Sequence, residues 1–205
     1  QTVWEPTLRG NDLTTEDTRT ALHEAVQEAN QAVLEKRAAQ NSDMSTTITA
    51  LLLVGNMAYI ANVGDSRTYL WDAAGLQRIT RDHSLVQQLV EAGELAPDDI
   101  YTHPQRNLIF LSIGDQPHIK ADVFEHKLAP DDCFLLCSDG LWEMLRDIGI
   151  EEVLMAETDP QRACDRMIVN ANLAGGDDNI SAIIVHVAPQ PDRTVLRDQG
   201  GTDGR

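Results

Sequence analysis

Two acidic turns adjoin apolar runs in the second half of the sequence. Ser138-Asp139-Gly140 directly follows the apolar run at residues 134–137, and Gly176-Asp177-Asp178-Asn179 directly precedes the apolar run at 180–187. A carboxylate at the end of a buried strand must be hydrogen-bonded, paired or bound to a cation, because a bare buried charge is costly. Carboxylates on two such rigid supports are the ligands that Mg²⁺ or Mn²⁺ prefers, with water in the remaining positions.

Each acidic turn taken alone has a simpler interpretation. An Asp at the position of Asp139 is typical of a helix N-cap, and Gly175 is typical of a helix C-cap that precedes a turn. The second carboxylate shifts the balance, because two adjacent Asp residues repel each other unless a cation or a dipole offsets them. The pair of turns therefore favours a cation site.

The composition limits the class of protein. The chain has 205 residues, enough for one domain with a sizeable core. Its 16 basic and 33 acidic residues give a formal charge of −17, which argues against nucleic-acid binding. The three cysteines, Cys133, Cys137 and Cys164, indicate core residues in a reducing compartment. No apolar run is long enough to span a bilayer and no signal peptide opens the sequence, so we expect a cytoplasmic protein.

The periodicity predicts a mixture of helices and antiparallel strands. A helix should begin at Thr14 or Thr15 and end near Arg37. Gly55-Asn56 predicts a hairpin, and the strands around it should form one antiparallel meander. The predicted strands are 46–54, 57–63, 68–71, 76–80, 121–126, 134–137 and 180–187. Further helices are predicted after Ser84, at 141–145, at 150–156 and after Asp159-Pro160; residues 94–106 should be an irregular loop, and 189–205 a disordered tail after a domain at 1–188.

Six short motifs occur in one order along the chain. The motifs are Met44-Ser45-Thr46-Thr47, Gly64-Asp65-Ser66-Arg67, Arg81-Asp82-His83-Ser84, His103-Pro104-Gln105-Arg106-Asn107, Ser138-Asp139-Gly140 and Gly176-Asp177-Asp178-Asn179. The set resembles the bacterial metal-dependent protein phosphatases (the PPM, or type 2C, family), from the first helix to Val187. That resemblance implies an α+β fold, in which two antiparallel β-sheets pack as a sandwich flanked by helices (α/β/β/α).

The resemblance also implies a chemistry and assigns residues to it. Asp139 resembles the carboxylate that binds the second metal, and Asp178 resembles its companion. Asp65 resembles a carboxylate that helps to hold a third, weaker metal beside Asp139. The alternative for Asp65 is that it orders its own turn through Ser66 and the backbone. The neighbouring residues Ser138, Gly140, Asn179 and Ser66 would support the site.

The implied reaction uses no side-chain nucleophile. Two or three Mn²⁺ or Mg²⁺ ions in the complete domain would activate a water that hydrolyses phosphoserine or phosphothreonine in proteins. The partners would be phosphorylated proteins, substrates of a serine/threonine kinase. Residues 94–106 resemble the mobile flap that shapes substrate access in bacterial members.

One part of the family pattern has no counterpart. The family's opening segment carries an Arg for the phosphate and an Asp-Gly whose carboxylate bridges both metals, and nothing before Met44 matches either. We therefore expect the chain to be the carboxyl-terminal part of a complete domain, and to be inactive alone. The alternatives are a non-catalytic member that binds phosphoproteins or partners, and an unrelated α/β protein with ordinary turns.

Overall fold

Two antiparallel sheets form the centre of the computed structural model, which describes residues 14–188. One sheet has the strand order β1-β2-β5 and the other the order β4-β3-β6-β7. Residues 1–13 and the predicted tail at 189–205 lie outside the described residues. The strands are β1 (Ile48–Val54), β2 (Met57–Val63), β3 (Arg67–Asp72), β4 (Gly75–Arg78), β5 (Asp122–Lys127), β6 (Cys133–Cys137) and β7 (Ala182–His186).

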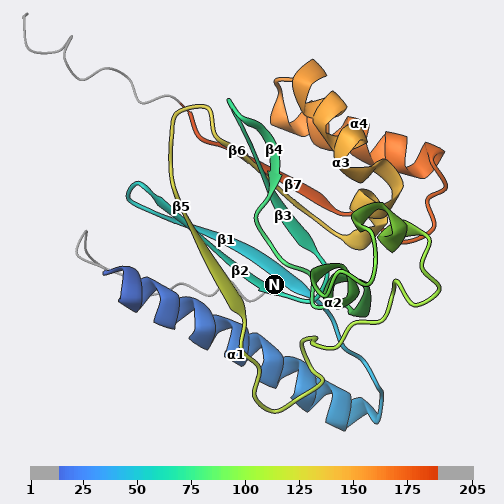
Figure 1. Cartoon of the computed structure of the whole chain (residues 1–205). Helices are drawn as coiled ribbons and strands as arrows, with labels where there is room; N and C mark the ends of the chain where they lie inside the picture. Colours follow the sequence, from blue (N-terminus) through green and yellow to red (C-terminus); the bar gives the residue numbers. More distant parts are fainter. Residues whose placement is uncertain (1–13, 189–205) are drawn as a thin grey trace, which may run out of the picture.

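Helices cover the outer faces of both sheets. α1 (Thr15–Gln40) lies along the three-stranded sheet, and α3 (Asp139–Ala156) and α4 (Pro160–Leu173) lie on the four-stranded sheet (Figure 1). The short helix α2 (Leu85–Glu91) and the 3₁₀ helix η1 (Pro97–Tyr101) belong to the long connection between β4 and β5. The layers thus run helix, sheet, sheet, helix, which confirms the expected sandwich.

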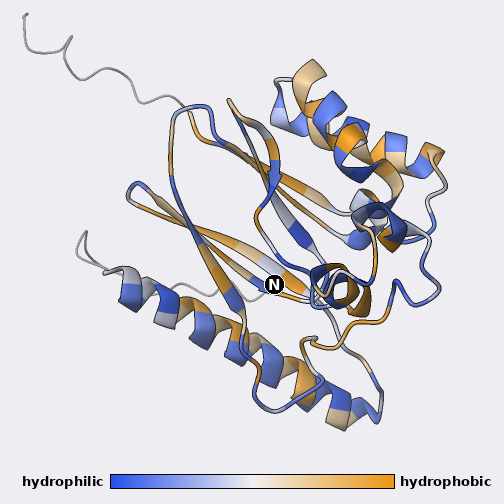
Figure 2. Cartoon of the chain, in the orientation of Figure 1, coloured by the Kyte–Doolittle hydropathy of each residue, from blue (hydrophilic) through white to orange (hydrophobic). Residues whose placement is uncertain are grey.

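Apolar side chains fill the three interfaces between these layers. Leu22 and Val26 of α1 pack against Tyr59 and Ala61 of β2. The layer between the sheets and the layer under α3 and α4 are also apolar, and Figure 2 shows hydrophobic residues along the strands. The buried members are Ala58, Ile60, Leu70, Phe134 and Leu136 between the sheets, and Tyr69, Cys133, Leu135, Cys137, Leu141, Trp142, Ile150, Val153, Leu154, Ala163 and Met167 under the helices.

The predicted single meander is wrong, although its strands exist. The hairpin β1–β2 has the two-residue turn Gly55-Asn56, as expected, with Val54 opposite Met57. β3 pairs with β4 and β6 in the other sheet, so the chain crosses between sheets at residues 64–66. Gly64 has a φ of 103° there, which favours glycine and redirects the chain. Local spacing shows where strands lie but not which sheet each one joins.

Most predicted helix boundaries are confirmed. Thr14 caps α1 and forms a capping box with Asp17, and the helix continues three residues past Arg37 to Gln40. Ser84 caps α2 and Asp159 caps α4, as the sequence predicts. The C-cap of α4 is Ala174, with Gly175 directly after it, so the predicted C-cap at Gly175 is displaced by one residue.

Two helical segments predicted after β6 belong to one interrupted helix. α3 includes both segments, at 141–145 and 150–156, and Arg146 between them has non-helical angles (φ 54°, ψ 173°). The N-cap position is Ser138, and Asp139 is the first residue of the helix. The interpretation of Asp139 as an N-cap is therefore wrong.

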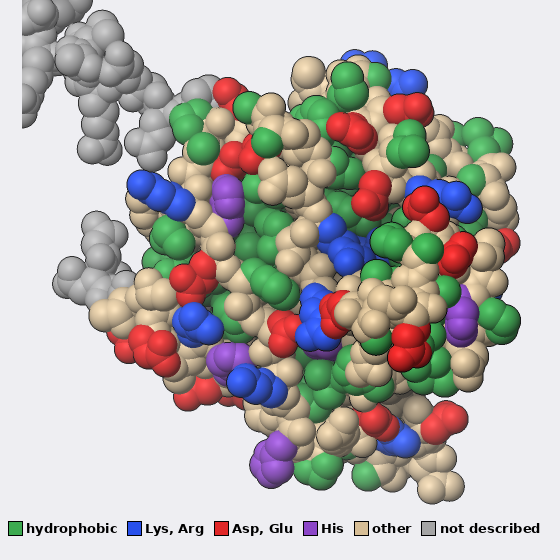
Figure 3. Space-filling model, viewed as in Figure 1, with side chains coloured by type: hydrophobic (Ala, Val, Ile, Leu, Met, Phe, Trp, Pro, Cys, Tyr) green, Lys and Arg blue, Asp and Glu red, His purple; other side chains and the backbone are tan. Residues whose placement is uncertain are grey.

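The surface and the cysteines agree with the composition. Acidic side chains are spread over the face shown in Figure 3, with basic side chains among them. Cys133, Cys137 and Cys164 are free and buried, as predicted.

Within residues 14–188, the helices all fall short of the length and apolarity that a bilayer-crossing helix needs.

Candidate functional site

The two acidic turns meet at one end of the four-stranded sheet. Asp139 directly follows Ser138 at the end of β6, and Asp178 lies four residues before β7 begins. β6 and β7 are antiparallel neighbours in which Cys137 lies opposite Ala182. The end of one strand therefore lies beside the start of the other, and the fold brings the two carboxylates from residues 39 positions apart to one place.

Ser138 ties the two turns together. Its backbone N–H donates to the carbonyl of Ser181 (3.2 Å), and its hydroxyl donates to the carbonyl of Asn179 (3.1 Å). The same hydroxyl accepts the N–H of Ser181 at 3.0 Å. A Cβ at Gly140 would lie 2.5 Å from the carbonyl oxygen of Asn179, so only glycine allows this approach. The predicted supporting roles of Ser138, Gly140 and Asn179 thus have a geometric basis.

Burial and mutual repulsion act on these carboxyl groups. Burial raises the pKa of Asp139, and the nearby negative charge of Asp178 raises it further. The N–H of Gly140 donates to Asp139 Oδ1 at 2.8 Å and opposes the shift. Asp178 is exposed and accepts the N–H of Asn179 at 2.6 Å. The pair therefore presents negative charge to one side, which a bound cation would offset.

Asp65 joins this charge cluster from the crossover between β2 and β3. Asp65 is only 6% exposed. Burial raises the pKa of its carboxyl to about 7, and the charges of Asp139, Asp82 and Glu143 add to the shift. Asp65 and Asp139 therefore lie close enough for the charge of one to raise the pKa of the other.

The turn around Asp65 is held from three sides. The N–H of Gly64 donates to Nδ1 of His83 at 3.0 Å. Trp142 Nε1 donates to the carbonyl of Asp65 at 3.0 Å, and the hydroxyls of Ser66 and Thr47 are 2.8 Å apart. Ser66 therefore pairs with Thr47, the residue directly before β1, and helps to fix the turn. Burial and nearby negative charges set the environment of the Asp65 carboxyl.

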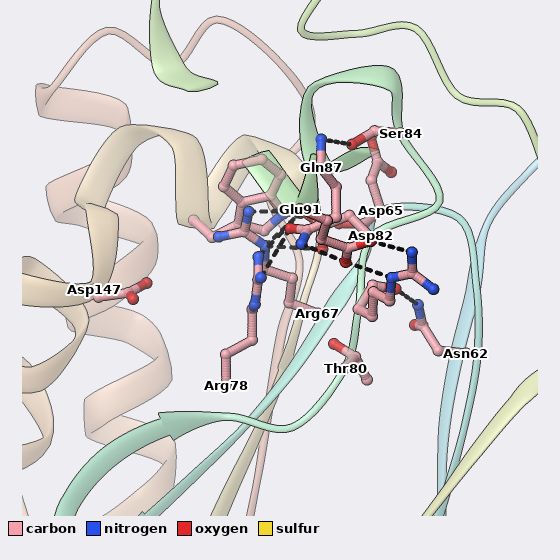
Figure 4. Close-up of polar contacts among 12 residues, drawn as sticks. Asn62, Asp65, Arg67, Arg78, Thr80, Asp82, Ser84, Gln87, Glu91 and Asp147 are labelled. Atoms are coloured by element: carbon pink, nitrogen blue, oxygen red, sulfur yellow. Dashed lines mark hydrogen bonds and ion pairs between the residues drawn. The ribbon is translucent and has the colours of Figure 1, made fainter. Parts of the chain in front are cut away.

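A buried ion-pair network lies behind this turn, and sequence reasoning missed it. Arg67 is 1% exposed, and its Nε and Nη2 donate to both carboxylate oxygens of Asp82, with the shortest distance at 2.7 Å. Its Nη1 donates to the hydroxyl of Tyr69, and its guanidinium carbon lies 3.4 Å from the ring centre of Trp142. Figure 4 shows Arg67, Asp82 and Asp65 gathered together. Trp142 links the two parts, because it contacts Arg67 and also holds the Asp65 backbone.

Three comparisons with known proteins bear on this site. The protein phosphatase 2C family model matches residues 5–91. The serine/threonine phosphatase stp of Listeria monocytogenes is 35% identical over 175 residues, which cover 84% of this chain and 69% of that protein. The protein phosphatase PhpP of Streptococcus pneumoniae is 37% identical over 142 residues, which cover 69% of this chain and 58% of that protein.

The chain belongs to the protein phosphatase 2C family.

Solved structures of phosphatases share the fold. The Mycobacterium tuberculosis serine/threonine phosphatase PstP/Ppp has a TM-score of 0.79 and 31% identity, over 84% of this chain and 74% of that one. A structure of the catalytic domain of PstP in complex with two manganese ions has a TM-score of 0.78 and 29% identity, over 87% of this chain and 75% of that one. These relatives are serine/threonine phosphatases, which confirms the resemblance and the enzyme class inferred from the six motifs.

The described residues offer the kind of ligand atom that a divalent cation prefers, but they offer few of them. Their donors are carboxylate oxygens, and the raised pKa of Asp139 and of Asp65 reflects burial and repulsion that a cation would relieve. Among residues 14–188, no three His, Cys, Asp or Glu side chains are grouped closely enough to enclose a metal. Mg²⁺ is commonly held by one or two carboxylates with several waters, so Asp139 and Asp178 fit that mode.

The segment that resembles the family's flap lies beside the cluster. It contains η1, and Arg106 at its end forms an ion pair with Glu143 of α3 (Nε–Oε2 3.4 Å). Glu143 also contributes to the raised pKa of Asp65. The predicted irregular loop at 94–106 is confirmed apart from the single 3₁₀ helix.

The raised pKa of Asp65 predicts how stability depends on pH. The folded carboxyl titrates near 7 and the unfolded one near 3.8, so between these values the folded state binds more protons. Stability contributed by this group therefore falls as pH rises from about 4 to about 7. We expect Asp65→Asn to be more stable than wild type at pH 8 and to lose that advantage at pH 4, in urea unfolding with EDTA present. An equal gain for the exposed Asp131→Asn, or no difference between the two pH values, would contradict this account.

Proposed function

We propose that the natural protein that contains this chain carries out metal-dependent hydrolysis of phosphoserine and phosphothreonine in proteins, and that the chain alone is inactive. The observation that supports this most is the convergence of Asp139 and Asp178, tied together by Ser138, in a member of a serine/threonine phosphatase family. Asp139 and Asp178 would hold a Mn²⁺ or Mg²⁺ ion, and Asp65 would support a third, weaker one beside Asp139. The structure of a relative with two manganese ions supports the choice of cofactor.

The chain's own residues define how the reaction is organised. A bound divalent cation supplies positive charge for phosphoryl oxygens and lowers the pKa of a bound water. Asp139, on the rigid end of β6, and Asp178, before β7, fix where that charge lies. Trp142, Ser66 and His83 hold the turn of Asp65 at the edge of this site.

Water is the nucleophile in this proposal because the thiols are poor candidates. Burial raises the pKa of Cys137 to about 12 and that of Cys133 to about 11. Both thiols are therefore protonated at neutral pH and buried in the core, which makes them unreactive. This supports the prediction that no side chain forms a covalent intermediate.

The substrates we propose are proteins phosphorylated by a serine/threonine kinase, and we place the reaction in the cytoplasm. Three free cysteines suit a reducing compartment, and the formal charge of −17 disfavours nucleic-acid substrates. A non-catalytic, phosphoprotein-binding role is the second candidate. The observation that favours it is the lack of a three-ligand cluster among residues 14–188.

Metal removal separates these two functions. In the natural protein that contains this chain, we expect hydrolysis of p-nitrophenyl phosphate and of a phosphothreonine peptide to stop with EDTA and to return with Mn²⁺. The physical reason is that the site offers carboxylates and no nucleophile of its own. Turnover that is equal with and without EDTA contradicts the proposed function, and peptide binding without any turnover favours the non-catalytic role.

A further inference from the structure

A polar hollow lies beside the carboxylate cluster, between the flap-like segment and the middle of α3. Its volume is about 240 Å³. Glu143 and Asp177 on its wall are close neighbours of the cluster, because Asp177 precedes Asp178 and the pKa of Glu143 is raised by burial and by the charge of Asp139. The lining residues are Tyr101, Arg106, Glu143, Met144, Arg146, Ala174 and Asp177.

Arg146 reaches this hollow through an unusual backbone conformation. Its φ of 54° and ψ of 173° lie in a region that favours glycine, and they interrupt α3. A residue with a Cβ pays strain there, and such outliers persist where the surrounding structure or the function requires them. The break therefore places an arginine on the wall of the hollow at a conformational cost.

The positive charge of the Arg146 guanidinium has no ion-pair partner among residues 14–188. The guanidinium lies 4.6 Å above the ring of Tyr101, and it takes part in none of the ion pairs found in the described part of the chain. Arg106, the other arginine of the hollow, is already paired with Glu143. In a protein of formal charge −17, an exposed and unpaired cation next to the site is a local exception that suits an anionic ligand.

We propose that Arg146 and this hollow form a subsite for an anionic group that flanks the phosphorylated residue of a substrate. The group is either the carboxylate of an Asp or Glu or a second phosphate, both of which a guanidinium binds with two parallel hydrogen bonds. The subsite rests on the proposed function, because it takes the phosphorylated residue itself to lie at Asp139 and Asp178. Tyr101 holds the guanidinium in place by stacking, so little side-chain freedom is lost on binding.

Peptide binding tests the subsite without requiring turnover. Fluorescence anisotropy would measure the dissociation constants of phosphothreonine peptides whose flanking residues are Glu, phosphoserine, Ala or Lys. We expect wild type to bind the Glu peptide about fivefold more tightly than the Ala peptide, as one exposed ion pair allows, and the doubly phosphorylated peptide more tightly still. Arg146→Gly should abolish these preferences while unfolding at a higher temperature, because glycine relieves the backbone strain.

Two matched variants control for charge and for folding. Arg146→Lys should keep part of the preference, since it keeps the charge and loses the bidentate geometry. Arg166→Ala removes an exposed charge from α4, outside the hollow, and should leave the preference as in wild type. Equal affinities for the Glu and Ala peptides in wild type, or a preference that survives in Arg146→Gly, overturns the subsite. If the natural protein that contains this chain shows the preference but never hydrolyses p-nitrophenyl phosphate, the proposed function is contradicted instead.

Discussion

Asp139→Asn and Asp178→Asn should each lower the phosphatase turnover of the natural protein that contains this chain by at least about 100-fold. Both changes delete a negative charge and keep the volume of the side chain. Partners of metal ligands already cost up to about 100-fold when removed, so loss of a ligand should cost no less. The measurement is Mn²⁺-dependent hydrolysis of p-nitrophenyl phosphate at saturating substrate, with circular dichroism to show that the fold is retained.

An acidic residue near the other end of β6 provides a control for the loss of a negative charge alone. Asp131 lies just before the opposite end of β6, and its side chain is 75% exposed. Asp131→Asn should keep turnover near the wild-type value. Full activity in both Asp139→Asn and Asp178→Asn would show that the active site has been placed at the wrong end of the sheet.

Arg67→Met should destabilise the domain by about 3–5 kcal/mol, because it leaves the carboxylate of Asp82 buried without its main partner. Asp82 is 3% exposed, and its remaining partner is Arg78 at 3.4 Å. The loss of stacking on Trp142 adds to the cost. Urea unfolding, with equal slopes for wild type and variant, gives the difference in free energy.

The double variant Arg67→Met/Asp82→Leu distinguishes a buried charge from lost packing. Replacing both partners of a buried pair by apolar residues is often close to neutral, so the double variant should be more stable than Arg67→Met alone. A double variant that is less stable than either single variant would mean that packing around Trp142, rather than the charge, dominates. Arg67→Met within about 0.5 kcal/mol of wild type, as at an ordinary surface position, would contradict the network itself.

Features that depend on short stretches of sequence could be predicted. Residues 133–137 form a fully buried strand as their continuous apolar run indicates, and Thr14 and Asp159 cap helices as their types predict. The two acidic turns were also recognisable, because Asp139 directly follows one apolar run and Asp178 lies just before another. In these cases the cause lies within a few residues of its effect, whereas the meeting of the two turns depends on the pairing of β6 with β7.

Features that depend on contacts between distant segments could not be predicted. Arg67 contacts Asp82, which is 15 positions further along the chain, and Trp142, which is 75 positions further along. No local pattern joins these residues. A signal was present, since Arg67 interrupts an apolar stretch inside a motif of which only Asp65 and Ser66 were assigned roles. The prediction that β2 and β3 belong to one meander failed for the same reason. The pairing of β2 with β5 and of β3 with β6 places the two strands in different sheets.

Calorimetric titration of Mn²⁺ into residues 1–205 tests the central claim most directly. The claim is that Asp139 and Asp178 form one cation site, and it predicts weak binding, of about millimolar affinity, since the described residues supply few ligands. Asp139→Asn and Asp178→Asn should each remove that binding, whereas Asp131→Asn should retain it. Mn²⁺ binding of equal affinity in wild type and in Asp139→Asn would contradict the account.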